Sequence, residues 1–365
     1  MERNIELQGG KLRLSRKIKI RHVSVYNVAV LVSCITLLWI FSVYGITYVP
    51  ASSMSDQILY KNLYNTGNVD MYFEVGYLFL CEVGALIGLT YQNFKTILAV
   101  ITYILISKRL KNYGVKYLFL LFLYILTAFP YDMEQSRSFF ASGVVIYATQ
   151  YLSEYSRKNV IRYILLIILA AMMHVSSLAY LVFVILFFKK REKIILILEI
   201  ITVALCCFGL VNGNDFSIIG KLLYLIIPSE RIIFWFSQST NWGFLGIWLF
   251  YFVILFALKY IVNSMGKVID KRKKFVFDVY MMMRLLCIML PFYMIATDFV
   301  RIIRCLFLLL FSAILVGTDI LIKERCETSL EKTKLLLGMR GSMILVSLVF
   351  LWMYQYTAVL VFSAF

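Results

Sequence analysis

The feature that most constrains this chain is a succession of apolar runs, separated by short clusters of Lys and Arg. A bilayer core of roughly 30 Å takes about 20 helical residues, and several of these runs approach that length. Of the 365 residues, 62% are hydrophobic and 16% are charged, which is too apolar for a soluble globular domain. The sequence therefore predicts an all-α polytopic integral membrane protein, with residues 1–365 forming a single membrane domain.

The basic clusters predict the orientation of the spans. A formal net charge of +17 would suggest a nucleic-acid partner in a soluble protein, but in a membrane protein it marks the cytoplasmic side, so no nucleic acid is expected. The basic leader 1–22 precedes the apolar run Val23–Tyr48, which is too long for a cleaved signal and predicts a cytoplasmic N-terminus. We expect about nine full spans, at residues 23–48, 94–107, 115–129, 137–152, 194–211, 243–260, 276–296, 300–316 and 342–362.

One apolar stretch, Met71–Leu89, does not fit this series. It carries Glu74 and Glu82, and if it crossed the membrane the following basic cluster would lie outside. A re-entrant or interfacial helix on the outer face, within an outer loop at 49–93, satisfies the charge rule. Two further connections are expected to be an outer loop at 212–242 and a mixed-charge cytoplasmic loop at 319–341.

A second exception lies between Arg162 and Lys189, where a long uncharged stretch has basic residues at both ends. A single crossing would place one of these basic clusters on the wrong side. Two short helices that meet near residues 172–177 fit better. His174 is then expected at the tip of a hairpin, on the outer side.

Three arginines are predicted near the outer surface: Arg137 where one span begins, and Arg301 and Arg304 where another begins. The spacing of three puts Arg301 and Arg304 on one helix face. Two interpretations stay open. An arginine fork suits a phosphate, and a membrane-bound substrate with phosphate groups would explain all three residues. Alternatively, the arginines snorkel or pair with the nearby carboxylates Asp132, Glu134 and Asp298.

His174 is one of two histidines, which excludes a histidine-cluster metal site. It is either a hydrogen-bonded buried imidazole or a general base for a hydroxyl group, since polar groups inside membranes are expensive and often functional. Carboxylates and tyrosines of the outer segments suit sugars, although aromatic belts give the same composition. The pattern Asp132-x-Glu134 suits a divalent cation but arises easily by chance. Arg284, within a span, is expected to pair with a neighbouring helix.

Several short motifs occur in this order along the chain: Asp56 and Tyr60, Glu74-Val75-Gly76-Tyr77, Asp132-Met133-x-Gln135-x-Arg137 followed by Ala141, His174-Val175-Ser176-Ser177, and Arg301-Ile302. Their order resembles the EpsG family of Wzy-like polysaccharide polymerases, over residues 56–311. Two departures concern Glu134, where a neutral residue is expected, and the late motif, which continues Arg304-Cys305-Leu306-Phe307 instead of with an aromatic pair. Either Arg301 or Arg304 is therefore the equivalent arginine.

The resemblance implies a glycosyltransferase of the bacterial plasma (inner) membrane, with a GT-C-like architecture and its active site on the outer side. It would move a growing O-antigen, capsule or exopolysaccharide chain from undecaprenyl diphosphate to a hydroxyl of the next lipid-linked repeat unit. Membrane lipids, a chain-length regulator and a flippase of the same pathway are the further partners, with no cofactor and no metal. The alternatives are a lipid-linked oligosaccharide flippase and an O-antigen-ligase-like transferase. The implied catalytic residues are His174, Arg137 and Arg301, and the implied substrate-binding residues are Arg304, Asp132, Gln135, Asp56, Tyr60, Glu74 and Tyr77.

Overall fold

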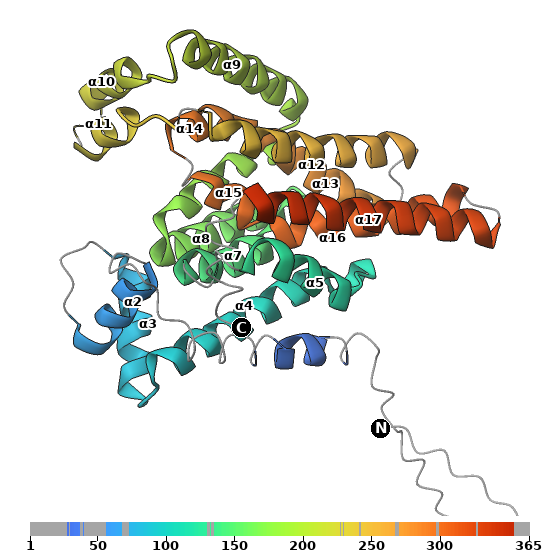
Figure 1. Cartoon of the computed structure of the whole chain (residues 1–365), viewed down its shortest axis with the longest axis horizontal. Coiled ribbons are helices and arrows are strands. Elements are labelled where there is room, and N and C mark those ends of the chain that lie inside the picture. The colour runs from blue at the N-terminus through green and yellow to red at the C-terminus, as the bar shows by residue number, and fades with distance from the viewer. Residues whose placement is uncertain are drawn as a thin grey trace, which may run out of the picture.

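The computed structural model is an elongated assembly of helices (Figure 1). It describes residues 28, 30–36, 39, 56–67, 73–129, 132, 135–226, 228, 230–240, 242–266, 270–296, 299–325 and 328–353. Within these ranges every regular element is a helix and no strand occurs, which confirms the all-α prediction. Most of the first predicted span and the end of the last lie outside the described residues.

The helices follow one another along the chain with short connections. Their bounds are α2 (Asp56–Thr66), α3 (Val75–Leu86), α4 (Tyr91–Leu110), η1 (Lys111–Tyr113), α5 (Tyr117–Thr127), α7 (Ser136–Ala148), η2 (Thr149–Ser153), α8 (Arg157–Met173), η3 (Val175–Phe187), α9 (Arg191–Val211), α10 (Ser217–Ile226), α11 (Glu230–Phe236), α12 (Phe244–Ser264), α13 (Lys271–Leu285), η4 (Leu286–Met289), α14 (Leu290–Ile295), α15 (Val300–Arg304), α16 (Phe307–Arg325) and α17 (Ser329–Met353).

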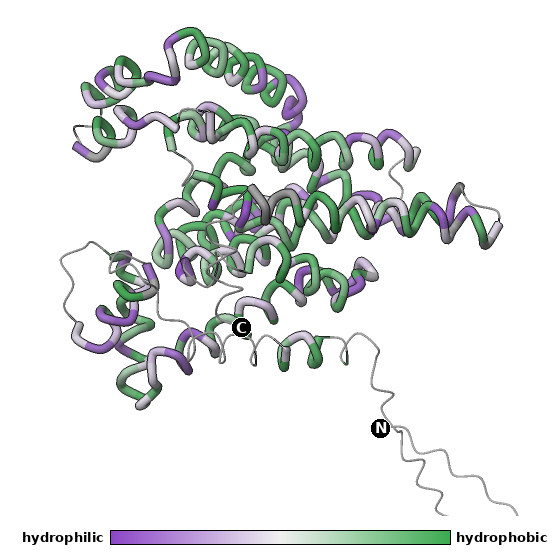
Figure 2. Tube along the Cα trace, in the orientation of Figure 1, coloured by the Kyte–Doolittle hydropathy of each residue, from purple (hydrophilic) through white to green (hydrophobic). Residues whose placement is uncertain are grey.

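Helices α12, α13, α16 and α17 pack side by side, and α9 to α11 extend along one edge of the molecule (Figure 1). The short helices α2 and α3 lie at the opposite corner, where α3 packs against α4 and α8. Hydrophobic residues dominate along the long helices, while hydrophilic residues gather toward their ends (Figure 2). Among the described helices, three are long and apolar enough to cross a membrane: Arg191–Val211, Phe244–Ser264 and Lys271–Ile295.

The hairpin predicted between the two basic clusters is present. Helix α8 ends at Met173, and η3 begins at Val175 and folds back along it. The Tyr163 hydroxyl donates a hydrogen bond to the carbonyl oxygen of Tyr180 at 2.6 Å, which ties the two arms together. His174 sits between them with extended backbone angles, φ −155° and ψ 114°, at the tip.

Two predicted spans are interrupted helices. The span expected at 276–296 runs through α13, η4 and α14, and Pro291 follows the break. Proline has no N–H to donate four residues back, so the helix tightens into a 3₁₀ turn there. The span expected at 300–316 divides into α15 and α16, where the Leu306 N–H bonds to the Ile303 carbonyl only three residues back.

Two segments expected to be loops are largely helical. Helices α16 and α17 continue through most of 319–341, because Leu, Lys and Glu are good helix formers even where they alternate in charge. Helices α10 and α11 occupy much of 212–242 and pack on each other, with Gly220 against Phe236.

Helix α5, which occupies the span expected at 115–129, has 11 residues and α3 has 12, so both are shorter than the roughly 20 residues that cross a bilayer core. Helix α3 occupies the segment 71–89, where a re-entrant or interfacial helix is expected. Its contact with α8 depends on Gly76. A Cβ atom added there would lie 2.8 Å from both the Cβ and the carbonyl oxygen of Met172. Because Gly76 allows this close approach, Glu74, two residues earlier, comes to lie beside His174, two residues after Met172.

The partner that the sequence analysis left unnamed for Arg284 is α9. The Nε and Nη2 atoms of Arg284 bind the two carboxylate oxygens of Glu199 at 2.7 and 2.8 Å, and Nη1 binds Glu192 at 2.9 Å. This bidentate pair links α9 to α13 and satisfies a charge within a predicted span.

We expect Gly76→Ala to lower the free energy of unfolding by about 1–3 kcal/mol, because the new methyl group must displace the backbone of α8. Unfolding of the purified protein in mixed detergent micelles measures this. Gly338→Ala in α17 is the matched control: no atom lies within 4 Å of its Cβ position, so it is expected to stabilise the helix slightly. Equal stability of the Gly76→Ala protein and wild type would contradict the close packing of α3 on α8.

Candidate active site

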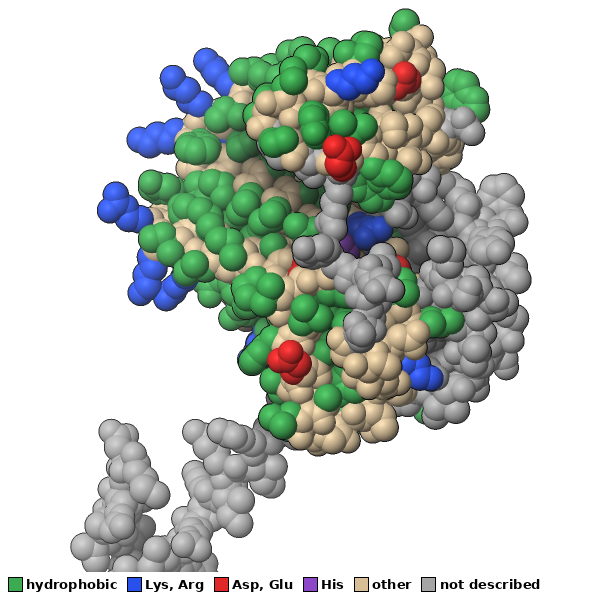
Figure 3. Space-filling view, turned by 90° about the vertical axis from the view of Figure 1, so that its left-hand side faces the viewer, with side chains coloured by type: hydrophobic (Ala, Val, Ile, Leu, Met, Phe, Trp, Pro, Cys, Tyr) green, Lys and Arg blue, Asp and Glu red, His purple; other side chains and the backbone are tan. Residues whose placement is uncertain are grey.

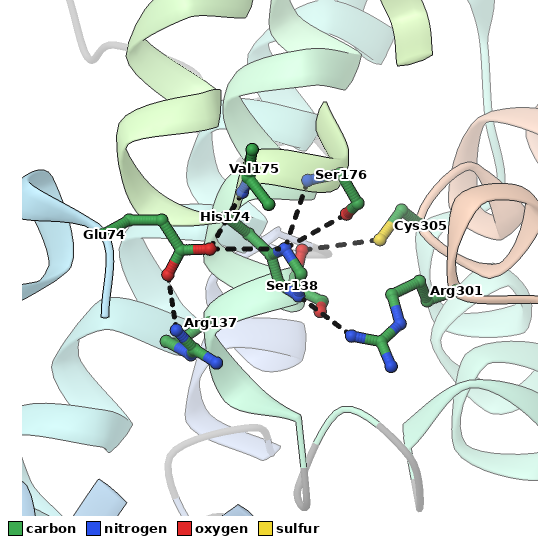
Figure 4. A network of polar contacts seen from close by, with 8 residues as sticks. All are labelled: Glu74, Arg137, Ser138, His174, Val175, Ser176, Arg301 and Cys305. Atoms are coloured by element: carbon green, nitrogen blue, oxygen red, sulfur yellow. Dashed lines mark hydrogen bonds and ion pairs between the residues drawn. The ribbon is translucent and has the colours of Figure 1, made fainter. Parts of the chain in front are cut away.

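Four ionisable side chains from four separate segments meet in one cluster (Figure 4). Glu74 precedes α3, Arg137 lies in the first turn of α7, His174 separates α8 from η3, and Arg301 lies in α15. Figure 4 shows Glu74 between Arg137 and the imidazole, with Arg301 on the other side of the imidazole. Residues far apart in the sequence thus form a continuous chain of polar contacts.

Both carboxylate oxygens of Glu74 bind protein groups. Oε2 accepts a hydrogen bond from Arg137 within an ion pair. Oε1 accepts one from the backbone N–H of Val175 at 3.0 Å and lies 3.8 Å from Nδ1 of His174. Glu74 therefore links the arginine of α7 to the start of η3, whereas the sequence analysis expects it to bind substrate.

Arg137 is held by aromatic rings as well as by a carboxylate. Its guanidinium carbon lies 4.7 Å from the ring centroid of Tyr60, 4.6 Å from that of Phe73 and 5.7 Å from that of Tyr77. Such cation–π contacts orient the planar guanidinium. Its side chain remains 14% exposed, so one part of the group faces the outside of the cluster.

Arg304, three residues after Arg301, has different partners. It is buried, at 3% exposure, and its Nη2 donates to the side-chain oxygen of Gln135 at 2.9 Å. Its Nε lies 3.3 Å from Oδ1 of Asp132. Burial raises the pKa of Asp132 to about 7, while Arg304 works against that rise. Arg304 thus ties α15 to the segment that precedes α7.

His174 is buried, with 6% of its surface exposed. Burial lowers the pKa of its imidazole to about 3, and the charges of Arg301, Arg137 and Arg304 act in the same direction. Nη1 of Arg301 lies 3.2 Å from Nε2, and a guanidinium has only donors, so Nε2 accepts. Nδ1 then carries the proton and lies 3.1 Å from the hydroxyl of Ser176. The Ser176 N–H also points at Nδ1, but at 3.4 Å it is the weaker contact and the charged donor decides the tautomer.

The cluster is reached from one face of the molecule. Arg137 and Arg301 are partly exposed, and a basic side chain and a histidine are visible in a hollow of the surface (Figure 3). A band of hydrophobic side chains separates this hollow from an edge where Lys and Arg side chains project (Figure 3). This separation has the form expected of a membrane protein with its basic residues on one side.

The remaining predicted residues lie in or beside the cluster, with few exceptions. Asp56 lies one turn before Tyr60 on α2, whereas Glu82 is exposed on α3. Glu134 and Asp298 lie outside the described residues. Among the residues that the structure describes, no three His, Cys, Asp or Glu side chains come together as metal ligands. Phe73, which lies against Arg137, is not among the predicted residues, because its only signal in the sequence is its position directly before Glu74.

Comparison with known proteins adds one finding: the model described as the EpsG family matches residues 30–361. No curated protein and no solved structure matches the chain.

We expect His174 to stay neutral between about pH 5 and 8, because its pKa lies far below the ordinary value of about 6.5. Nitrogen NMR of ¹⁵N-histidine-labelled His22→Gln protein, which retains His174 alone, measures this directly. One protonated and one bare ring nitrogen should persist across the range. The same sample unfolded in denaturant is the control and should titrate near pH 6.5.

A midpoint near pH 6.5 in the folded protein would contradict the buried, neutral imidazole. The lowered pKa of His174 also determines how the stability of the folded state depends on pH. Because the unfolded chain binds a proton below about pH 6.5 and the folded imidazole does not, this residue makes the folded state less stable as the pH falls toward 3.

Proposed function

Because this chain belongs to the EpsG family, the family of Wzy-like polysaccharide polymerases, we propose that it extends a bacterial surface glycan. In this proposal the donor is a growing glycan on undecaprenyl diphosphate, and the acceptor is a hydroxyl group of the next lipid-linked repeat unit. The family supports polymerase activity, and the cluster around His174 supports the chemistry.

The proposal rests on a buried imidazole whose Nε2 lies within hydrogen-bond distance of Arg301, in a cluster where both Arg137 and Arg301 are partly exposed. An arginine binds phosphate oxygens through parallel hydrogen bonds, and a diphosphate offers oxygens to both Arg137 and Arg301. Of the two late arginines, Arg301 is therefore the one assigned to the substrate, since Arg304 is buried against Asp132 and Gln135.

We propose that these groups carry out the transfer in one step. Nε2 of His174 takes the proton from the acceptor hydroxyl as its oxygen forms a bond to the anomeric carbon of the donor glycan. The bond from that carbon to the carrier oxygen breaks, and its electron pair stays on the diphosphate. Arg137 and Arg301 stabilise the charge that develops there. General-base catalysis of this kind contributes about 10²–10⁴ in rate.

The other residues implied to bind substrate have one of two roles: they support an arginine, or they contact the sugars. Tyr60 and Tyr77 support the guanidinium of Arg137, so they act on the diphosphate through it. Asp132 and Gln135 hold Arg304 through an ion pair and a hydrogen bond. Asp56, partly exposed on α2, is the carboxylate assigned to sugar hydroxyls.

We further propose that the site faces the outer side of the plasma membrane and the N-terminus the cytoplasm. Two observations support this orientation: the basic leader of the sequence and the basic edge across the hydrophobic band from the hollow. A chain-length regulator and a flippase of the same pathway remain the partners proposed for the protein in the cell.

A deletion strain complemented with variants tests the function. Surface glycan is separated by size after complementation with wild type, Arg137→Ala, His174→Ala or Arg162→Ala at matched membrane levels. Arg162 is the control because it is exposed on α8, the helix that ends beside His174. We expect single capped repeat units in the deletion, at least 100-fold less long glycan with Arg137→Ala and His174→Ala, and wild-type chains with Arg162→Ala.

Other outcomes would overturn specific parts of the proposal. Long glycan from both Arg137→Ala and His174→Ala would refute the site. Lipid-linked repeats trapped inside the deletion strain would indicate a flippase, and long chains that accumulate on the carrier would indicate a ligase.

A further inference from the structure

The contact between Arg301 and His174 bears on when the imidazole can act as a base. Nη1 of Arg301 lies 3.2 Å from Nε2, and this guanidinium nitrogen only donates. A neutral imidazole has one nitrogen with a lone pair in the ring plane, and here that lone pair accepts from Arg301. The nitrogen that would take a proton from a hydroxyl group is therefore occupied.

The other ring nitrogen offers no alternative. Nδ1 carries the proton and lies near the carboxylate of Glu74 and the hydroxyl of Ser176, at 3.8 and 3.1 Å. Glu74 is itself held by Arg137 and the Val175 N–H. The imidazole is 6% exposed, so protein groups surround most of the ring.

We propose that Arg301 caps the base in the absence of substrate and that a diphosphate removes the cap by drawing the guanidinium onto its own oxygens. This inference rests on the proposed function. A guanidinium binds a phosphate through charge-assisted, often bidentate hydrogen bonds, which are stronger than one bond to a neutral imidazole nitrogen. The donor diphosphate thus supplies the driving force for the rearrangement.

The surroundings of α15 restrict the movement to one side chain. Arg304 is buried against Asp132 and Gln135, which anchors the helix, whereas Arg301 is partly exposed. The consequence is an order of events: His174 accepts a proton only after the donor diphosphate has bound, so an acceptor hydroxyl that arrives first is not activated.

Chemical modification of the imidazole tests the cap without turnover. Diethyl pyrocarbonate acylates unprotonated imidazole nitrogens, and full-length His22→Gln protein in detergent, purified without a histidine tag, reports on His174 alone. Inorganic pyrophosphate is the probe. We expect saturating pyrophosphate to raise the acylation rate by about tenfold, since a hydrogen bond to a charged group is lost from Nε2.

Two variants in the same background separate the cap from general effects of charge. Arg301→Ala should react rapidly without pyrophosphate and show no further increase. Arg162→Gln, at an exposed position on the helix that ends beside His174, should react slowly, as the parent does, and still respond to pyrophosphate. The ¹⁵N signal of Nε2 gives a second measurement on the parent protein, which should shift with pyrophosphate while Nδ1 keeps its proton.

The outcomes distinguish this inference from the function on which it rests. Pyrophosphate that binds, by isothermal titration, but leaves the acylation rate unchanged or lowers it would overturn the cap and leave the polymerase proposal intact. An Arg301→Ala protein as unreactive as its parent would do the same. Absence of pyrophosphate binding would overturn both the cap and the diphosphate site.

Discussion

The carboxylate of Glu74 holds the other parts of the site together. It neutralises Arg137 and accepts from the N–H of Val175, so one side chain joins the helix that carries an anion-binding group to the hairpin that carries the base. A partly buried guanidinium without a counter-charge would be costly at this position. The short helix α3 follows directly from Glu74, and Gly76 lets that helix approach closely enough for these contacts to form.

Much of this arrangement is predictable because two separate constraints act on the charged residues of a membrane protein. The distribution of Lys and Arg predicts where the chain cannot cross, which is why the hairpin around His174 follows from the basic residues Arg162 and Lys189 alone. Polar groups in apolar surroundings must also pair with one another, because an unpaired polar group there costs free energy. Arg137, His174 and Arg301 lie far apart in the sequence, yet each is polar at the end of an apolar run, and the structure brings them together.

Other features depend on tertiary packing, which no local sequence pattern predicts. A spacing of three places Arg301 and Arg304 on one face, but it does not indicate that Asp132 and Gln135 bury Arg304 and leave Arg301 partly exposed. The sequence likewise predicts carboxylates beside the arginines, but Arg137 pairs with Glu74, which the sequence assigns to substrate and whose two oxygens are both occupied. Mixed charge at 319–341 predicts a loop, whereas α16 and α17 cover most of it, because the same Leu, Lys and Glu residues favour helix.

The electrostatics of the cluster determine both the protonation state and the basicity of His174. Burial and the positive charges of Arg301, Arg137 and Arg304 keep His174 neutral, but those charges also make it a weak base. On the proposed function, a bound diphosphate brings negative charge against Arg137 and Arg301 and offsets the field that lowers the pKa of His174. The ligand that provides the leaving group therefore also strengthens the base, and the two halves of the transfer reaction are coupled through the same arginines.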